Sequence, residues 1–411
     1  MRHPRAALAA AWLATRALMV WLLTLRGWDA MGREVRLYHH WYGVLAHGAH
    51  PVRDTLWQYP PGAGPLLLSP GLLPGLTYFQ AFVALTLAAD ALTALALARA
   101  GTRPGRTLLG AGVWIGGLPL LLHLPLARYD VQVTALAVLA LLASTRSTRV
   151  CGALAALAAL VKVWPVLLLM GLPKGRATRS ARTAALVTGT TVLALLVTLF
   201  DHPFAFLRRQ GGRGVQIESL GGTLLALARH AGWPGKVRYR YGALEYTGPY
   251  VSTVAHVSLA LTVVALALVL LWRARARHWG EATPYDAALS AVLLITVTSR
   301  VISPQYLIWL LGLAAVCLTS RHTTQRPVAA LVLAATAVSA VVYPVLYDQV
   351  AAATWTGCAL MVVRNGLLGA AAVLSFTRVW RSSAGVPPPR VSAGSRAVTP
   401  VVPSGSGRLV H

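Results

Sequence analysis

Residues 144–179 read STRSTRVCGALAALAALVKVWPVLLLMGLPKGRATR, an apolar stretch between two basic clusters. Short loops rich in Lys and Arg remain on the cytoplasmic side of a membrane, so both clusters belong to one side. The apolar residues between them must therefore enter the membrane and return. One full crossing already needs about twenty residues, so we predict two half-length helices that turn near Lys162 and Pro165. Such a turn is tolerated only where it is buried in protein or lines a wet cavity.

The composition of the whole chain agrees with a membrane protein. Of 411 residues, 56% are hydrophobic and 12% are charged, against about 25% charged in soluble domains. The net charge of +26 would suit nucleic-acid binding, but Lys and Arg form short clusters between apolar runs and no basic stripe. We therefore expect no nucleic-acid partner. The three cysteines form no C-x-x-C pair, which predicts neither a disulfide nor a metal–thiolate site.

Hydropathy predicts an all-α polytopic membrane protein with about twelve transmembrane segments, some of them short or broken. No repeat of fixed period is visible. The first segment is read as a retained helix, because no small-residue cleavage site follows it. The segments are 6–26, 76–99, 107–126, 130–144, 150–160, 163–172, 183–200, 251–272, 285–298, 304–319, 327–343 and 357–378.

The distribution of Lys and Arg orients these segments. The N-terminus and the basic loops fall inside, which leaves two long outer loops at about 27–75 and 201–250. We predict a membrane domain over 1–378 in the plasma membrane. Residues 379–411 are rich in Pro, Ser, Gly, Arg and Val, and are expected to form a disordered, basic cytoplasmic tail.

Acidic side chains gather on the outer side in this topology. A carboxylate near a membrane is costly unless it is paired or wet, so the cluster suggests a task on the extracytoplasmic face. The alternative is that outer loops are simply solvated. The eight residues are Asp29, Glu34, Asp54, Asp130, Asp201, Glu218, Glu245 and Asp348.

The first outer loop contains an amphipathic pattern. Glu34, Tyr38 and either Trp41 or Tyr42 share one face of a helix, as in helices that lie at headgroup level. Tyr59 then precedes two prolines, which restrict the backbone to an extended turn. A rigid loop with aromatic and acidic groups suits a substrate that is part lipid and part sugar.

Two histidines in this loop, His39 and His40, have no partner at metal-ligand spacing. We predict no metal site and no cofactor.

Three cations are expected to share the outer face: Lys162 at the predicted turn, Arg213 in the second long loop and Arg300 at a helix start. A lysine at membrane depth is a functional candidate, and an arginine beside helix N–H groups suits a phosphate. Snorkelling to headgroups is the alternative for Arg300. Glu218, Gln305 and Tyr306 are expected to line the same cavity.

Arg128 and Asp130 stand two residues apart at a helix start. They form either a local ion pair or cap, or an arginine-held carboxylate in the cavity. Cations and carboxylates on one face are what transfer from a lipid-phosphate sugar needs, since cations stabilise the leaving phosphate and a carboxylate deprotonates the acceptor hydroxyl. Nucleotide-binding glycine motifs and a Gly-x-Ser-x-Gly elbow are missing from the sequence.

The chain resembles glycosyltransferase family 87 of the membrane-embedded C-type superfamily, whose members include actinobacterial polyprenol-phosphate-mannose-dependent mannosyltransferases. The resembling residues are Glu34-Val-Arg-Leu-Tyr38, Gly48 to Pro51, Tyr59-Pro60-Pro61, Arg128-Tyr129-Asp130, Lys162-Val-Trp-Pro165, Arg213 to Ser219, Ser303-Pro304-Gln305-Tyr306 and Arg364-Asn365.

The resemblance implies a C-type glycosyltransferase fold and an inverting, metal-independent transfer from a polyprenyl monophosphate sugar, with mannose as the favoured sugar. The acceptor would be an envelope glycolipid or glycan. The family's base is usually Asp in an Asp-x-x-x-Tyr pattern, and Glu34 takes that place here. Asp130 is the second candidate, and Asp54 and Asp29 are weaker ones. Two hypotheses compete with this one: a transporter or flippase of lipid-linked sugars, and a non-catalytic envelope scaffold.

Overall fold

The structure is a computed structural model that describes residues 4–25, 28–207 and 212–384. It confirms the all-α polytopic architecture. Six helices in the described ranges are long and apolar enough to span a membrane. They are α1 (Pro4–Leu25), α4 (Tyr78–Gly101), α8 (Arg176–Leu199), α11 (Val251–Arg275), α14 (Arg326–Ala340) continued by the π-helical turn η5 (Val341–Val345), and α16 (Trp355–Ser383).

Shorter apolar helices fill the remaining predicted segments. Two of them, α12 (Thr283–Thr298) and α13 (Tyr306–Cys317), are buried along nearly their whole length. A helix surrounded by protein can be shorter than the bilayer, because its ends meet polar groups of the chain and not lipid. The others are α5 (Leu109–Gly117) with η2 (Leu118–Leu121), α6 (Asp130–Ala143), α7 (Thr148–Val161) and the 3₁₀ helix η4 (Trp164–Gly171).

The break near Lys162 has the predicted form. Helix α7 ends at Val161, and Lys162 has an extended backbone (φ −145°, ψ 135°). Pro165 lies in the first turn of η4, where its missing N–H and fixed φ are tolerated. At ~1.5 Å per residue, fourteen-residue α7 is too short to cross a hydrocarbon core of about 30 Å.

Small residues bring the short helices together. A Cβ added at Gly152 of α7 would lie 2.0 Å from the carbonyl oxygen of Ala181 in α8, and one added at Gly110 of α5 would lie 2.2 Å from that of Ala315 in α13. Only glycine permits backbones to approach this closely, as at small-residue interfaces in membrane helices.

One end of the molecule carries the elements of the two long loops. The first loop forms α2 (Trp28–Leu45), α3 (Ala63–Leu68) and η1 (Ser69–Leu72), and η3 (Leu124–Ala127) and α15 (Tyr347–Ala351) come from shorter turns. The second loop forms α10 (Leu220–His230) and three strands, β1 (Val215–Gln216), β2 (Lys236–Arg240) and β3 (Ala243–Thr247).

The strands form an antiparallel sheet in the order β1-β3-β2, which the sequence did not lead us to predict. Tyr241 and Gly242 join β2 to β3, and both have positive φ, +51° and +77°. Positive φ at both central residues is the requirement of a type I′ hairpin.

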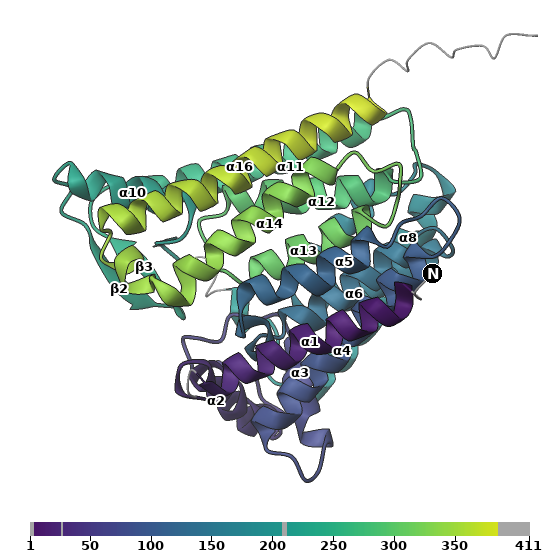
Figure 1. Cartoon of the computed structure of the whole chain (residues 1–411). Coiled ribbons are helices and arrows are strands. Elements are labelled where there is room, and N and C mark those ends of the chain that lie inside the picture. The colour runs from purple at the N-terminus through teal and green to yellow at the C-terminus, as the bar shows by residue number, and fades with distance from the viewer. Residues whose placement is uncertain (1–3, 26–27, 208–211, 385–411) are drawn as a thin grey trace, which may run out of the picture.

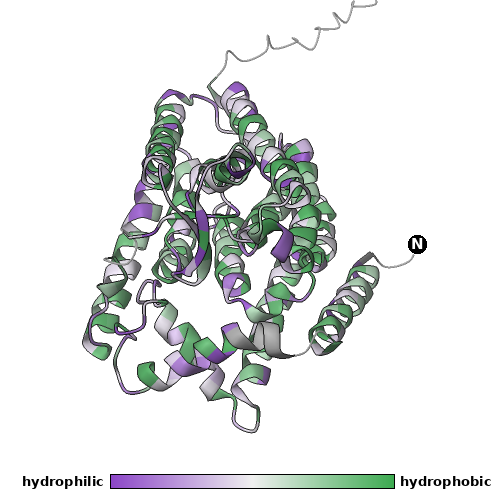
Figure 2. Cartoon of the chain, turned by 90° about the vertical axis from the view of Figure 1, so that its left-hand side faces the viewer, coloured by the Kyte–Doolittle hydropathy of each residue, from purple (hydrophilic) through white to green (hydrophobic). Residues whose placement is uncertain are grey.

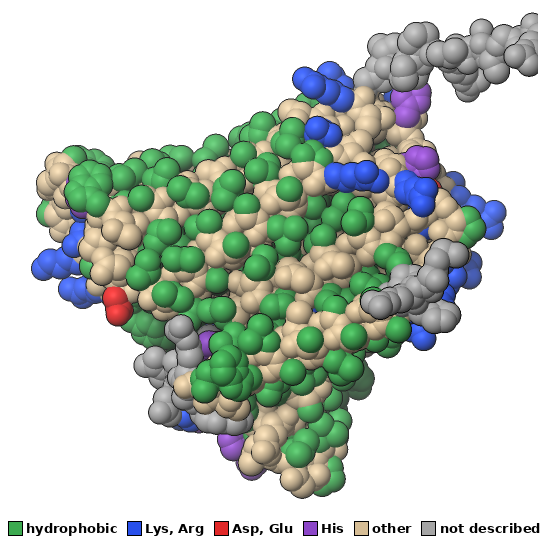
Figure 3. Space-filling model, in the orientation of Figure 1, with side chains coloured by type: hydrophobic (Ala, Val, Ile, Leu, Met, Phe, Trp, Pro, Cys, Tyr) green, Lys and Arg blue, Asp and Glu red, His purple; other side chains and the backbone are tan. Residues whose placement is uncertain are grey.

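The two ends of the molecule differ in charge. The start of α1 and the end of α16 lie at one end, and the sheet and α10 lie at the other (Figure 1). Lys and Arg side chains gather at the end with the termini, with a smaller group beside the sheet, and apolar side chains cover the middle (Figure 3). Viewed onto the sheet end, hydrophilic segments lie centrally among hydrophobic helices (Figure 2).

The predicted tail lies mostly outside the described residues. Helix α16 continues to Ser383, five residues past the expected end of the membrane domain at 378. The remainder, 385–411, is not among the described ranges.

Candidate active site

A cavity of about 450 Å³, which we name the Glu34 cavity, lies where α2, the α7–η4 break, α13 and the β2–β3 hairpin meet. An adjoining cavity of about 670 Å³, the Glu218 cavity, shares the walls made by Glu34, Arg128 and Gln305. Seven of the predicted site residues line the first: Glu34, Tyr59, Arg128, Lys162, Arg213, Gln305 and Tyr306.

Glu34 is held by one of its two oxygens. Oε1 forms an ion pair with Nη1 of Arg128 and accepts a hydrogen bond from the Tyr38 hydroxyl at 3.0 Å. Among the described residues, none hydrogen-bonds to Oε2. Glu34 lines the cavity, and anchoring through one oxygen fixes the orientation of its carboxylate, as a general base requires.

A cluster of packed aromatic side chains surrounds Tyr38, the hydrogen-bond partner of Glu34. Tyr38 is buried and packs on Tyr129 and Phe82 at ring-centroid distances of 5.7 and 5.5 Å. Tyr59 packs edge-on against Tyr129 (5.3 Å) and Trp41 (5.6 Å). Tilted and edge-on pairs at these distances are the favourable ones, so α2, the first loop and the start of α6 are locked together.

Asp130 lies behind the cavity wall and does not line either cavity. Its side chain is 1% exposed, and Oδ1 contacts the Lys162 ammonium at 2.6 Å and the Trp309 indole N–H at 2.6 Å. The ammonium also lies 4.8 Å from the Tyr129 ring centre and 5.0 Å from that of Trp309, within cation–π range. The positive charge of Lys162 is thus balanced by the Asp130 carboxylate and the two rings. Asp130 is placed to fix the position of the ammonium.

The rigid Tyr-Pro-Pro loop contacts the end of α7 directly. The Gly62 N–H donates to the Leu160 carbonyl at 3.0 Å. A Cβ at position 62 would lie 2.6 Å from the carbon and oxygen of that carbonyl. The loop can therefore approach α7 this closely only with glycine at position 62. Tyr59 and Lys162, which are far apart in sequence, reach one cavity through this contact.

Glu218 lines the second cavity rather than the first. It precedes Ser219, whose hydroxyl caps α10 by accepting the Gly222 N–H, and it pairs with the fully buried Arg364 of α16 at 3.4 Å. Burial raises the pKa of Glu218 to about 7, against the opposing charges of Arg364 and Arg128.

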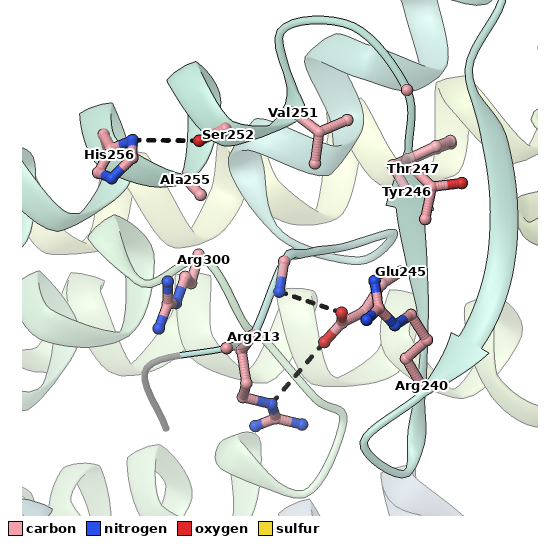
Figure 4. Close-up of a pocket in the computed structure, with 13 residues that line it drawn as sticks. Arg213, Arg240, Glu245, Tyr246, Thr247, Val251, Ser252, Ala255, His256 and Arg300 are labelled. Atoms are coloured by element: carbon pink, nitrogen blue, oxygen red, sulfur yellow. Dashed lines mark hydrogen bonds and ion pairs between the residues drawn. The ribbon is translucent and has the colours of Figure 1, made fainter. Parts of the chain in front are cut away.

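Arg300 lies on a third pocket, next to the Glu34 cavity, and not in the cavity itself. Arg213 lines both spaces. In the third pocket Arg213, Arg240 and Arg300 lie around Glu245 (Figure 4). Burial raises the pKa of Glu245, while the Gly214 N–H and the arginines act in the opposite direction.

Several site residues were not predicted. Trp309 bonds Asp130 and stacks on Tyr306 at 4.1 Å, and Trp164 stacks on Trp309 at 5.3 Å. Trp309 follows Tyr306 by three residues on one helix, so helical spacing from the Ser-Pro-Gln-Tyr motif would have indicated it. Tyr239, Tyr241 and Gly242 reach the cavity through the unpredicted hairpin.

In the described ranges, no three His, Cys, Asp or Glu side chains group as metal ligands. His39 stacks on Tyr78 at 4.8 Å instead.

Comparison with known proteins gives one family. No curated protein matches the chain. The sequence model of glycosyltransferase family 87 matches residues 57–304, more than half of the chain. The match includes Tyr59, Arg128, Lys162 and Arg300, and it begins after Glu34. On this match, together with the multi-pass helical fold and the cavity at one end, the chain is a membrane glycosyltransferase that belongs to glycosyltransferase family 87.

Proposed function

We propose that the protein transfers mannose from a polyprenyl monophosphate donor to a hydroxyl of an envelope glycolipid or glycan, on the extracytoplasmic face of the plasma membrane. The observation that carries the proposal is the placement of Glu34, which lines a cavity with cationic and aromatic side chains and is anchored to Arg128 through Oε1. Family membership supports a transferase rather than a transporter or a scaffold.

The proposed chemistry is a single displacement. Glu34 Oε2 takes the proton of the acceptor hydroxyl as the hydroxyl oxygen attacks the anomeric carbon. The bond from that carbon to the phosphate oxygen breaks, the phosphate leaves with the electron pair, and the configuration inverts. Arg213 lines the same cavity and supplies positive charge for the leaving phosphate. Arg128 and Tyr38 orient Glu34, and Lys162 takes its position from Asp130.

The role of Glu34 is tested by Glu34→Gln, which keeps the shape of the side chain and removes the base. We expect transfer from a labelled polyprenyl phosphate mannose in isolated membranes to fall by about 10²-fold or more, with normal protein levels. The control is Glu281→Gln, the same change at a half-exposed residue between α11 and α12 that lines none of the three cavities. Full activity of Glu34→Gln would exclude Glu34 as the base.

A further inference from the structure

The pocket that contains Arg300 has a volume of about 390 Å³ and a marked excess of positive charge. We name it the Arg300 pocket. Its arginines come from three separate segments: Arg213 precedes β1, Arg240 ends β2, and Arg300 lies between α12 and α13. Glu245 of β3 is the one acidic residue among its described lining residues. Three guanidinium groups against one carboxylate leave a net positive pocket, which attracts anions.

The Glu245 carboxylate satisfies Arg213 only partly. Glu245 Oε2 accepts the Gly214 N–H at 3.1 Å, and Oε1 lies 3.8 Å from Arg213 Nε, beyond hydrogen-bond distance. Both Oε1 and Nε are buried and make no hydrogen bond within the described chain. Buried polar atoms normally have partners, so the Arg213 guanidinium retains donor capacity for an anion.

One wall of the Arg300 pocket belongs to a helix that faces lipid. Ser252, Ala255 and His256 come from the first two turns of α11 (Figure 4). The same helical stripe continues with Leu259, Ala260 and Val263, all exposed on the surface of the protein. An anion bound among the arginines would therefore have an apolar track beside it, which is the environment of a lipid phosphate and not of a free ion in water.

The Arg300 pocket also adjoins the site of the proposed reaction. Arg213 lines both this pocket and the Glu34 cavity. In the Glu34 cavity, Arg128 and Lys162 are already paired with Glu34 and Asp130. Arg213, which the two spaces share, has a buried Nε that makes no hydrogen bond within the described chain.

We propose that the Arg300 pocket binds the phosphate of a lipid whose hydrocarbon chain lies along the Leu259–Ala260–Val263 stripe of α11. Resting on the proposed function, we assign this lipid as the sugar donor. The sugar of the donor then extends past Arg213 into the Glu34 cavity. The phosphate remains bound by Arg213, Arg240 and Arg300.

The test measures binding of farnesyl phosphate, a lipid phosphate without sugar, to the purified full chain in lipid nanodiscs. We expect Arg240→Gln and Arg300→Gln each to raise the dissociation constant roughly tenfold, because each removes a charge-assisted hydrogen bond. Arg53→Gln is the matched control, since Arg53 is exposed in the first loop and lines none of the three cavities. Farnesol and inorganic phosphate should each bind much more weakly than farnesyl phosphate.

Two results would overturn the inference. One is unchanged binding of farnesyl phosphate by Arg240→Gln. The other is competition by inorganic phosphate as strong as that of farnesyl phosphate, which would indicate a free-anion site. The proposed function fails separately: if lipid phosphate binds as expected but no sugar phosphate supports transfer, the site stands and the reaction does not. If transfer occurs and Arg240→Gln binds normally, the reaction stands and this site does not.

Discussion

Two carboxylates near the cavity, Glu34 and Asp130, differ in what surrounds them. Asp130 is sealed behind Lys162 and Trp309 with 1% exposure. Glu34 is 22% exposed and reaches the cavity. A general base must lie within hydrogen-bond reach of the acceptor hydroxyl, so at the residue scale the geometry supports our proposal of Glu34 as the base and of Asp130 as a positioning residue.

The buried Lys162–Asp130 ion pair leads to a prediction about the stability of the protein. Lys162→Met leaves the buried carboxylate without its cation, and breaking a buried pair from one side costs about 3–5 kcal/mol. We expect a clear drop in the melting temperature of the detergent-solubilised protein. Lys162→Met combined with Asp130→Asn removes both charges and should recover much of that loss.

The exposed Lys236 of β2 provides the control for this pair, and Lys236→Met should leave the melting temperature unchanged. A double variant no more stable than Lys162→Met alone would show that the pair is not the source of the effect.

At the scale of elements, the first outer loop is positioned by backbone contact with α7. The Gly62 N–H bonds the Leu160 carbonyl, and Leu160 lies two residues before Lys162 at the end of that helix. The position of the loop that contains Tyr59 is therefore coupled to the position of the break at Lys162. A substitution at the contact should displace both residues.

Gly62→Ala tests this coupling. Its Cβ would overlap backbone atoms of Leu160, and backbone cannot move aside as a side-chain end can. We expect a loss of about 1–3 kcal/mol and reduced transfer, measured by thermal unfolding and the membrane assay. Gly43→Ala in α2 is the matched control, because no atom lies within 4 Å of its added Cβ and alanine favours a helix. Equal behaviour of the two variants would contradict the coupling.

At the scale of the whole molecule, the basic end and the sheet end lie at opposite ends of the helices, and we expect them to face opposite sides of the bilayer. The positive-inside rule predicts a cytoplasmic basic end, and we therefore propose that the Glu34 cavity lies on the outer side. The buried Arg16–Asp90 pair, with Nη2 to Oδ1 at 2.7 Å, ties α1 to α4 inside this arrangement. Pairing is what makes two charges tolerable at membrane depth.

Cysteine labelling tests the orientation. Lys236 on the sheet and Arg146 between α6 and α7 are both exposed, whereas native Cys151, Cys317 and Cys358 are buried. In intact cells a membrane-impermeant maleimide should label Lys236→Cys and not Arg146→Cys, which should react only after permeabilisation. The reverse pattern would place the cavity in the cytoplasm.

The sequence by itself determined the membrane segments and the break at Lys162. The length of an apolar run and the positions of Lys and Arg are local properties of the sequence. They predict membrane segments because each segment must by itself meet the requirements of the bilayer. Each of the twelve predicted segments contains a helix. The short motifs also indicated residues of the cavity: Arg128, Lys162 and Gln305 stand at the ends of those segments, and Glu34 lies in the first outer loop.

The tertiary structure alone decided which carboxylate is available, that Arg300 lies in a neighbouring pocket, and that a three-stranded sheet closes the cavity. These features depend on partners that are distant along the chain: Trp309 is 179 residues from Asp130, and Arg364 is 146 from Glu218. Local periodicity contains no information about which ends of helices meet. Burial and charge pairing at those meeting points are set by packing of the whole chain, and the roles that we propose rest on them.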